Sequence, residues 1–171
     1  MDWTICALSL RGASHIATGL PCQDSNRHRT VKTRIGEYII LVVSDGCGTA
    51  THSHIGAELI TTEVADCLGF WLQNASKFPD LPELLSFSLG HAHQCLKKAA
   101  ERLSISINEL AATCICLVIG PDRYAAAQVG DGIIIGIGNG ASGCVFWPNQ
   151  EYANVTHTLT EKEWLINTQI L

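Results

Sequence analysis

The sequence predicts a layered α+β domain, and three observations support this prediction. A near-continuous run of apolar, β-branched residues covers 37–44, and two segments with apolar residues at helical spacing cover 53–74 and 80–103. Short strand-like runs then return after residue 112. Strands, two helices and strands again form a segregated order, unlike alternating strand–helix units. With 47% hydrophobic residues among 171, the chain suffices for one core, so we expect one domain over residues 1–171.

The first part of the chain is expected to contain two strands. Residues 3–10 (WTICALSL) are apolar and predict the first strand, and residues 11–36 are polar, with glycine and proline breaks that predict an irregular segment. The run 37–44 (EYIILVVS) lacks apolar–polar alternation, which predicts a strand that is buried on both faces.

The two helices are predicted from their apolar stripes and, for the second, from its start. The second helix begins with the capping-box pattern Asp80-x-x-Glu83 and has Pro82 in its first turn. Both stripes indicate ordinary core-facing surfaces. The stripe of the first helix comprises Ile60, Val64, Cys67, Leu68 and Trp71, and that of the second comprises Leu85, Leu89, Ala92, Leu96, Ala99 and Leu103.

The last third of the chain is expected to be mainly β structure. A turn at 120–122 separates the first two strands, and the glycines of 138–143 are interpreted as a hairpin connection, because a strand rather than a helix follows them. A second capping-box pattern, Thr160-x-x-Glu163, predicts the start of a helix. The predicted strands cover 112–119, 123–129, 132–138 and 143–147.

Composition argues against several classes of protein. The net charge of -5 and the single loose basic stretch at 27–34, interpreted as a solvated loop, argue against nucleic-acid binding. The apolar runs 38–43 and 133–137 are far shorter than the roughly 20 residues of a membrane-spanning helix. The N-terminus shows no basic, signal-like segment, so we expect a cytoplasmic protein. Eight cysteines without paired spacing are expected to be free thiols, and a structural zinc site is not expected.

Three aspartates stand out as candidate metal ligands. Asp45 follows the buried strand directly, and Gly46 beside it leaves room for its own carbonyl to approach the same ion. Asp131 lies between two glycines after a predicted strand, and Asp24 ends the segment 21–24 (PCQD). Carboxylate-rich sites suit hard cations such as Mg²⁺ or Mn²⁺.

Together with their surroundings, these aspartates make the sequence resemble the protein phosphatase 2C family, in particular its bacterial 2C-like branch. The resemblance covers nearly the whole chain, and the matching stretches occur in the order of the family. They are 12–15 (GASH), 19–24 (GLPCQD), 42–48 (VVSDGCG), 56–57 (GA), Thr113, 127–132 (AQVGDG) and 151–160 (EYANVTHTLT).

The resemblance implies a four-layer αββα sandwich with two Mg²⁺ or Mn²⁺ ions at one edge of the sheets. It implies that Asp45 bridges both ions, that the Gly46 carbonyl completes one coordination shell, and that Asp24 acts mostly through bound water. Asp131 is implied to support the site from a neighbouring turn. All three aspartates are therefore candidate catalytic residues, and metal-activated water replaces a protein nucleophile.

Three departures from the family are visible. The arginine that often precedes the Gln-Asp pair is missing, so Arg11 and His15 are the candidate phosphate-binding residues. Cys47 occupies the place of a histidine that serves some members as general acid, which leaves His15, His52, His54 or water for that role. The later Asp-Gly and terminal aspartate motifs are not in the sequence, so we expect residues 1–171 to be an N-terminal portion of the fold.

The resemblance implies an enzyme that hydrolyses phosphoserine or phosphothreonine in proteins. The expected partner is a phosphoprotein substrate, a bacterial signalling or regulatory protein. The alternative is a catalytically inactive, phosphatase-like module that binds a partner protein or a phosphopeptide, and the missing arginine and aspartates favour it. A purely structural α+β domain would require all the matching stretches to be coincidental.

Overall fold

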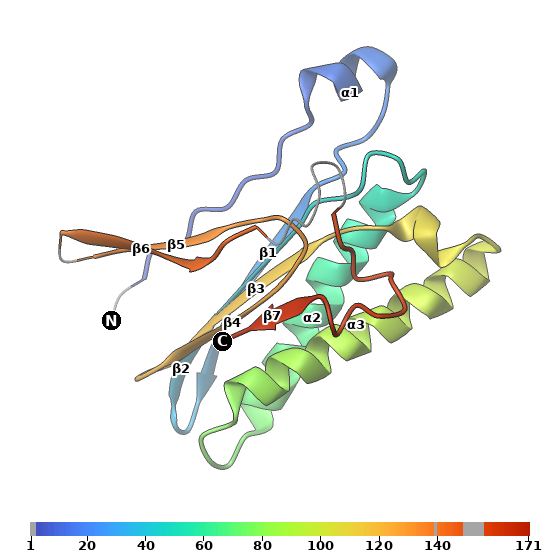
Figure 1. Cartoon of the computed structure of the whole chain (residues 1–171). Helices are drawn as coiled ribbons and strands as arrows, with labels where there is room; N and C mark the ends of the chain where they lie inside the picture. The colour runs from blue at the N-terminus through green and yellow to red at the C-terminus, as the bar shows by residue number, and fades with distance from the viewer. Residues whose placement is uncertain (1–2, 139, 149–155) are drawn as a thin grey trace.

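The computed structural model describes residues 3–138, 140–148 and 156–171. A five-stranded antiparallel sheet forms the centre, in the order β1-β2-β3-β4-β7, and helices α2 and α3 pack side by side against one face (Figure 1). Hairpin β5–β6 forms a separate two-stranded sheet. The elements are α1 (Ala13–Thr18), β1 (Ser25–Thr33), β2 (Gly36–Ser44), α2 (Ser53–Asn74), α3 (Leu81–Leu103), a 3₁₀ turn (Ile107–Leu110), β3 (Cys114–Ile119), β4 (Tyr124–Val129), β5 (Ile134–Gly138), β6 (Ala141–Phe146) and β7 (Thr168–Ile170).

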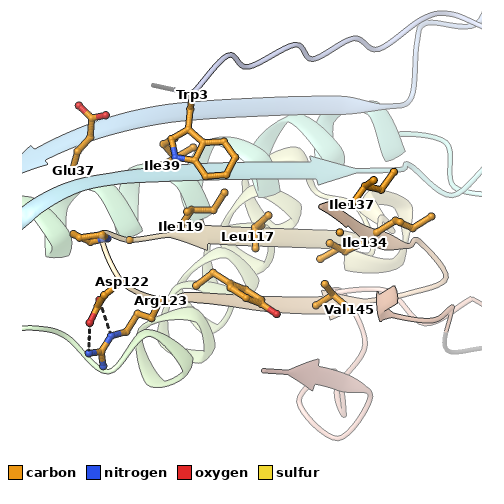
Figure 2. Close-up of a pocket in the computed structure, with 15 residues that line it drawn as sticks. Trp3, Glu37, Ile39, Leu117, Ile119, Asp122, Arg123, Ile134, Ile137 and Val145 are labelled. Carbon is orange, nitrogen blue, oxygen red and sulfur yellow. Dashed lines mark hydrogen bonds and ion pairs between the residues drawn. The ribbon is translucent and has the colours of Figure 1, made fainter. Parts of the chain in front are cut away.

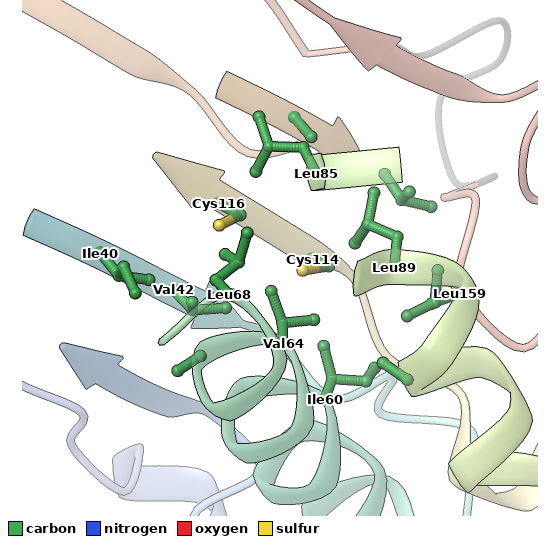
Figure 3. Packing of buried hydrophobic residues seen from close by; sticks show 14 of the residues in the cluster. Ile40, Val42, Ile60, Val64, Leu68, Leu85, Leu89, Cys114, Cys116 and Leu159 are labelled. Atoms are coloured by element: carbon green, nitrogen blue, oxygen red, sulfur yellow. The ribbon is translucent and has the colours of Figure 1, made fainter. Parts of the chain in front are cut away.

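The core lies between the helices and the inner face of the sheet (Figure 3). Alternate residues of β2, such as Ile40 and Val42, point to the helices, and Cys114 and Cys116 do the same from β3. Since successive side chains of a strand point to opposite faces, this alternation gives one sheet face to the core. The helices contribute the buried residues Ile60, Val64, Leu68 and Leu72 from α2, and Leu85, Leu89, Ala92 and Leu96 from α3.

The helix predictions are confirmed in extent and largely in their buried faces. The Asp80 side chain caps α3 by accepting a hydrogen bond from the Glu83 amide at 3.0 Å. Trp71 departs from the prediction, because it is 48% exposed and packs edge-on against Phe70 and Phe87 instead of entering the core. Leu72, one position further along, is buried in its place.

The outer face of the sheet is only partly covered. Hairpin β5–β6 and the N-terminal segment lie over it and border a partly open cavity of about 890 Å³ (Figure 2). The prediction that β2 is buried on both faces is therefore wrong at its end, where Val43 is 44% exposed. The labelled apolar side chains that line the cavity are Trp3, Ile39, Leu117, Ile119, Ile134, Ile137 and Val145.

The first strand is not the predicted one. Residues 3–10 form no regular strand, and Leu8 and Leu10 are exposed. The strand is β1 (SNRHRTVKT), within the segment expected to be irregular. Its basic side chains are exposed because β1 is an edge strand, and such strands commonly carry charges that prevent further pairing. The pattern of apolar residues does not predict this strand, because pairing with β2 stabilises it and its own residues are mostly polar.

The helix expected from Thr160 is also absent from the described residues. Turns follow residue 158 instead, and β7 then pairs with the edge of β4. The Glu161 carboxylate accepts hydrogen bonds from the Thr158 amide at 2.9 Å and from the Asn167 amide group at 3.2 Å. These local bonds favour a turn over a helix. The strand that follows the turns pairs with the edge of β4, whose backbone groups a helix here would leave unpaired.

The remaining strand predictions are confirmed within a few residues. The turn at 120–122 joins β3 to β4, and the glycines of 138–143 join β5 to β6 in a hairpin. Residue 139 and the part 151–155 of the last matching stretch lie outside the described residues. Among the residues that are described, no helix is long and apolar enough to cross a membrane.

Candidate functional site

The three candidate aspartates meet at one edge of the central sheet. Asp24 immediately precedes β1 and Asp45 immediately follows β2. Because these strands are antiparallel and Ser25 pairs with Ser44, the two aspartates are brought to neighbouring positions at the same edge. The sheet register therefore explains why residues 21 positions apart in sequence share a site.

Asp131 reaches the same edge through the next two strands. Ile115 pairs with Val43 at the end of β2, and Cys114 pairs with Val129 at the end of β4. Asp131 follows Val129 by two residues, so the turn after β4 lies at the same sheet edge as the end of β2, with β3 between them. The predicted positions of Asp45 and Asp131 after strands are confirmed, and Asp24, expected in a polar segment, lies directly before β1.

The Asp45 carboxyl group is affected electrostatically by both Asp24 and Asp131. The pKa of Asp45 is raised to about 6, first by desolvation, next by a hydrogen bond with Asp24, and then by the negative charges of Asp24 and Asp131. Asp45 is accessible to solvent as a residue, but the surrounding protein removes part of the water from its carboxyl group. A cluster of mutually repelling carboxylates is a donor set that fits a hard divalent cation, which would offset the repulsion.

The backbone around Asp45 is fixed by β3 and by the segment before β1. The Asp45 amide donates a hydrogen bond to Thr113 Oγ1 at 3.0 Å, and the Thr113 amide donates to the Asp45 carbonyl at 2.9 Å. The Ser44 hydroxyl donates to the Thr113 carbonyl at 2.6 Å. Thr113 thus binds both residues at the end of β2, and it limits the directions in which the Asp45 side chain can point.

Gly46 is held where a larger residue would not fit. Its amide donates to the Gln23 carbonyl at 3.1 Å, and a Cβ atom at this position would lie 2.6 Å from the same oxygen. The Gln23 amide group donates to Ser53 Oγ at 2.8 Å, at the start of α2. Gln23 therefore connects the Asp24 segment, the Gly46 turn and α2, so that Asp24 and Asp45 are positioned together.

The Asp131 turn is fixed by a different set of contacts. Thr156 Oγ1 donates to Asp131 Oδ2 at 3.0 Å. Gly130 has a φ of 111°, a conformation that favours glycine, and a Cβ there would lie 2.6 Å from Thr113 Cγ2. The buried Gln128 amide nitrogen lies 2.8 Å from the Gly132 carbonyl, 3.2 Å from that of Gly130 and 3.3 Å from that of Trp147.

The sequence does not predict the structural roles of Gln23, Gln128 and Thr113. All three lie in stretches that match the family, and this match is the feature of the sequence that points to them. Their function is to orient the backbone beside an aspartate, which no spacing rule predicts. It depends on which side chain the folded sheet brings within 3 Å of a given amide or carbonyl group.

The other candidate residues lie in the segment before β1 and between the end of β2 and the first turn of α2. Arg11 precedes α1 and His15 lies within it, in a segment that projects beyond the sheet (Figure 1). Their assignment as phosphate-binding residues stays a prediction. Cys47 follows Gly46, and its Sγ lies 3.4 Å from Thr49 Oγ1. His52 and His54, at the start of α2, each have a buried Nδ1 atom without a hydrogen-bond partner among the described residues.

Comparisons with known proteins agree on one family. The sequence model of protein phosphatase 2C matches residues 11–171. The chain is 28% identical over 166 residues to serine/threonine-protein phosphatase 3 of Escherichia coli (strain K12), which covers 95% of this chain. The match spans 65% of the length of that relative.

Solved structures of bacterial phosphatases share the fold. A bacterial serine phosphatase with a point mutation aligns with a TM-score of 0.59 and 16% identity over 87% of this chain and 62% of its own. The serine/threonine phosphatase Stp1 from Staphylococcus aureus aligns with a TM-score of 0.52 and 17% identity over 72% of this chain and 46% of its own. These alignments confirm the predicted phosphatase-type α+β fold, of which the chain contains a part. By its sequence and its architecture, the chain belongs to the protein phosphatase 2C family.

Proposed function

We propose that the protein hydrolyses phosphoserine and phosphothreonine in other proteins, and that the cluster of Asp24, Asp45 and Asp131 is its metal centre. The observation that supports this proposal most strongly is that Asp24 and Asp131 both act on the Asp45 carboxyl group. Burial and two neighbouring carboxylates raise the pKa of Asp45 to about 6. A site for an anionic phosphate cannot consist of such a cluster unless cations offset its charge.

We assign the ligand roles from the positions of the groups. Asp45, with the Gly46 carbonyl beside it, would hold the Mg²⁺ or Mn²⁺ ions, and Asp24 would contact them mostly through water. Asp131 would orient the site from the turn after β4. When two such ions are bound, they supply an activated water molecule and offset the charge on the attacking and leaving oxygens. The chain's own contribution is to fix Asp45 through Thr113 and the adjacent Gly46 through Gln23.

Substrate binding requires a cationic or hydrogen-bonding group for the phosphate. Arg11 and His15 are our candidates, because both belong to the segment that precedes Asp24 in the chain. The substrate would be a phosphoprotein, a bacterial signalling or regulatory protein, encountered in the cytoplasm. The metal ions leave no need for a protein nucleophile.

The test is release of phosphate from a phosphoserine peptide by the complete gene product, with and without Mn²⁺. We expect turnover to require Mn²⁺ and to be lost in Asp45→Asn, a substitution that keeps the size of the side chain. Asp122→Asn, at an exposed carboxylate that pairs with Arg123 at 2.8 Å, serves as the matched control and should retain turnover. Binding of the phosphopeptide without hydrolysis would contradict the proposal and support the alternative, a binding module.

A further inference from the structure

A second group of potential metal ligands lies on the helical layer. Glu63 of α2 and His91 and Cys95 of α3 present one ligand atom each, and the three atoms lie within 4.8 Å of one another. His91 and Cys95 are four residues apart on one helix, so their side chains lie on the same face. Glu63 faces them from the neighbouring helix, and the group therefore connects α2 to α3.

The group is separate from the aspartate cluster. Glu63 lies ten residues after Ser53, the first residue of α2, which at 1.5 Å per residue places it about 15 Å along the helix. The aspartates lie near that first residue, where Gln23 contacts Ser53. The donor chemistry differs as well, since the helical group offers nitrogen, sulfur and oxygen, whereas the aspartate cluster offers oxygen alone.

The distances within the group match those between the ligands of one tetrahedral ion. With bonds of about 2.0–2.3 Å, a tetrahedral zinc ion holds its ligand atoms about 3.3–3.8 Å apart. Cys95 Sγ lies 3.5 Å from Glu63 Oε2 and 3.6 Å from His91 Nε2. His91 Nε2 lies 3.0 Å from Glu63 Oε2, shorter than that range because the two atoms form a direct hydrogen bond. Opening this one contact by a few tenths of an ångström suffices for an ion.

The surroundings of the group suit a bound cation. Glu63 and Cys95 are half-buried, and His91 is exposed, which leaves an approach from solvent. One carboxylate and one thiolate would together offset the charge of a divalent ion. Lys98, the other charged group close to Cys95, opposes this but is exposed to solvent. No aromatic or apolar side chain takes part in the three contacts that define the group.

We propose that Glu63, His91 and Cys95 form a binding site for Zn²⁺ between α2 and α3, with water as the fourth ligand. The mixture of imidazole, thiolate and carboxylate is typical of zinc, while Mg²⁺ prefers oxygen alone. On binding, the Cys95 thiol releases its proton to solvent and the sulfur forms the bond to the metal. Since the ligands come from two helices, bound Zn²⁺ would stabilise their packing. This proposal departs from the sequence expectation that no structural zinc site is present.

The experiment is a titration of the metal-free protein with Zn²⁺ and, separately, with Co²⁺, both in excess Mg²⁺. Excess Mg²⁺ competes for the aspartate cluster, and the Asp45→Asn variant reports any Zn²⁺ that still binds there. We expect one equivalent of Zn²⁺ to bind, and Co²⁺ to give the visible absorption of a tetrahedral ion together with a thiolate charge-transfer band. We expect Cys95→Ser and His91→Ala each to weaken Zn²⁺ binding by more than about 100-fold, since even outer-shell changes at zinc sites cost 10–100-fold.

Three controls separate this site from other metal binding. Cys6→Ser removes an exposed thiol elsewhere, and Glu101→Gln removes an exposed carboxylate of the same helix, so both should bind Zn²⁺ normally. Asp45→Asn should also bind Zn²⁺ normally, which makes the result independent of the proposed phosphatase activity. Octahedral Co²⁺ spectra, or Zn²⁺ binding that is unchanged in both Cys95→Ser and His91→Ala, would overturn the proposal. His91 is exposed, so its replacement leaves the fold intact and keeps the test decisive.

Discussion

Replacing Asp45 by asparagine is expected to stabilise the metal-free protein while it removes metal binding. In the folded protein the pKa of Asp45 is raised from 3.8 to about 6, so the charged form is disfavoured there. A shift of about two pH units corresponds to about 3 kcal/mol if nothing screens the group. Because Asp45 is accessible to solvent, screening reduces this value, and we expect a gain of about 1 kcal/mol at neutral pH.

The pH dependence of this gain follows from the sign of the shift. Above pH 6 both the folded and the unfolded wild-type protein carry the charged group, and the full cost of folding it is present. Between pH 6 and 3.8 the folded protein binds the proton more strongly, so the stability of the wild type rises as the pH falls. The advantage of Asp45→Asn should therefore shrink over this range and vanish below pH 3.8.

Urea unfolding in the presence of a chelator, at a series of pH values, measures this difference. Asp122→Asn is the control, since the neighbouring Arg123 lowers the pKa of Asp122 and its neutralisation should bring no gain. The electrostatic reasoning would be refuted if Asp45→Asn were less stable than wild type at pH 7.5. It would also be refuted if the difference in free energy of unfolding between the two proteins were the same at every pH. The description of the aspartates as mutually repelling would then be wrong.

Three further predictions concern the site and the core. In calorimetric titration with Mn²⁺, Asp131→Ala should weaken binding, whereas Asp45→Ala should abolish it; equal affinities would contradict the assignment of Asp45 as the principal ligand. Cys47→His in the complete gene product should accelerate hydrolysis of substrates with poor leaving groups more than of those with good ones, because protonation matters most for a basic leaving oxygen. Gly56→Ala should lower the free energy of unfolding by at least about 2 kcal/mol, because the new Cβ would lie 1.9 Å from the Leu110 carbonyl oxygen. Urea titration measures this change, and an unchanged midpoint would show that the backbone moves apart at little cost.

The sequence predicted those elements whose own residues determine them. The β-branched run before Asp45 and the apolar stripes that contain Leu68 and Leu89 are local patterns. Most of their residues are buried as expected, and Val43, Trp71 and Leu103 are the exposed exceptions. Strand β1 and the turns after residue 158 could not be predicted in this way. The first is stabilised by its pairing with β2, and the second by bonds from the Glu161 carboxylate and by the free edge of β4.

The candidate site likewise contains some residues that local patterns predict and some contacts that only the folded structure shows. Asp45 and Asp131 were found because a strand followed by Asp-Gly is a recognisable local pattern. The contacts of Thr113 with Asp45 bridge 68 positions of sequence, so only the register of β2 and β3 reveals them. The Glu63, His91 and Cys95 group was missed for a related reason. Its spacing is regular on α3, but the third ligand comes from another helix.

The single amide group of Gln128 has a mechanical consequence for the hairpin β5–β6. It lies within 3.3 Å of carbonyl oxygens before β5 and after β6, and also of the carbonyl next to Asp131. Rotation of the hairpin about its base must therefore either break these contacts or pull the Asp131 turn with it. A strand or partner that docks on the hairpin and moves it would therefore shift the Asp131 carboxylate of the proposed metal centre through these Gln128 contacts.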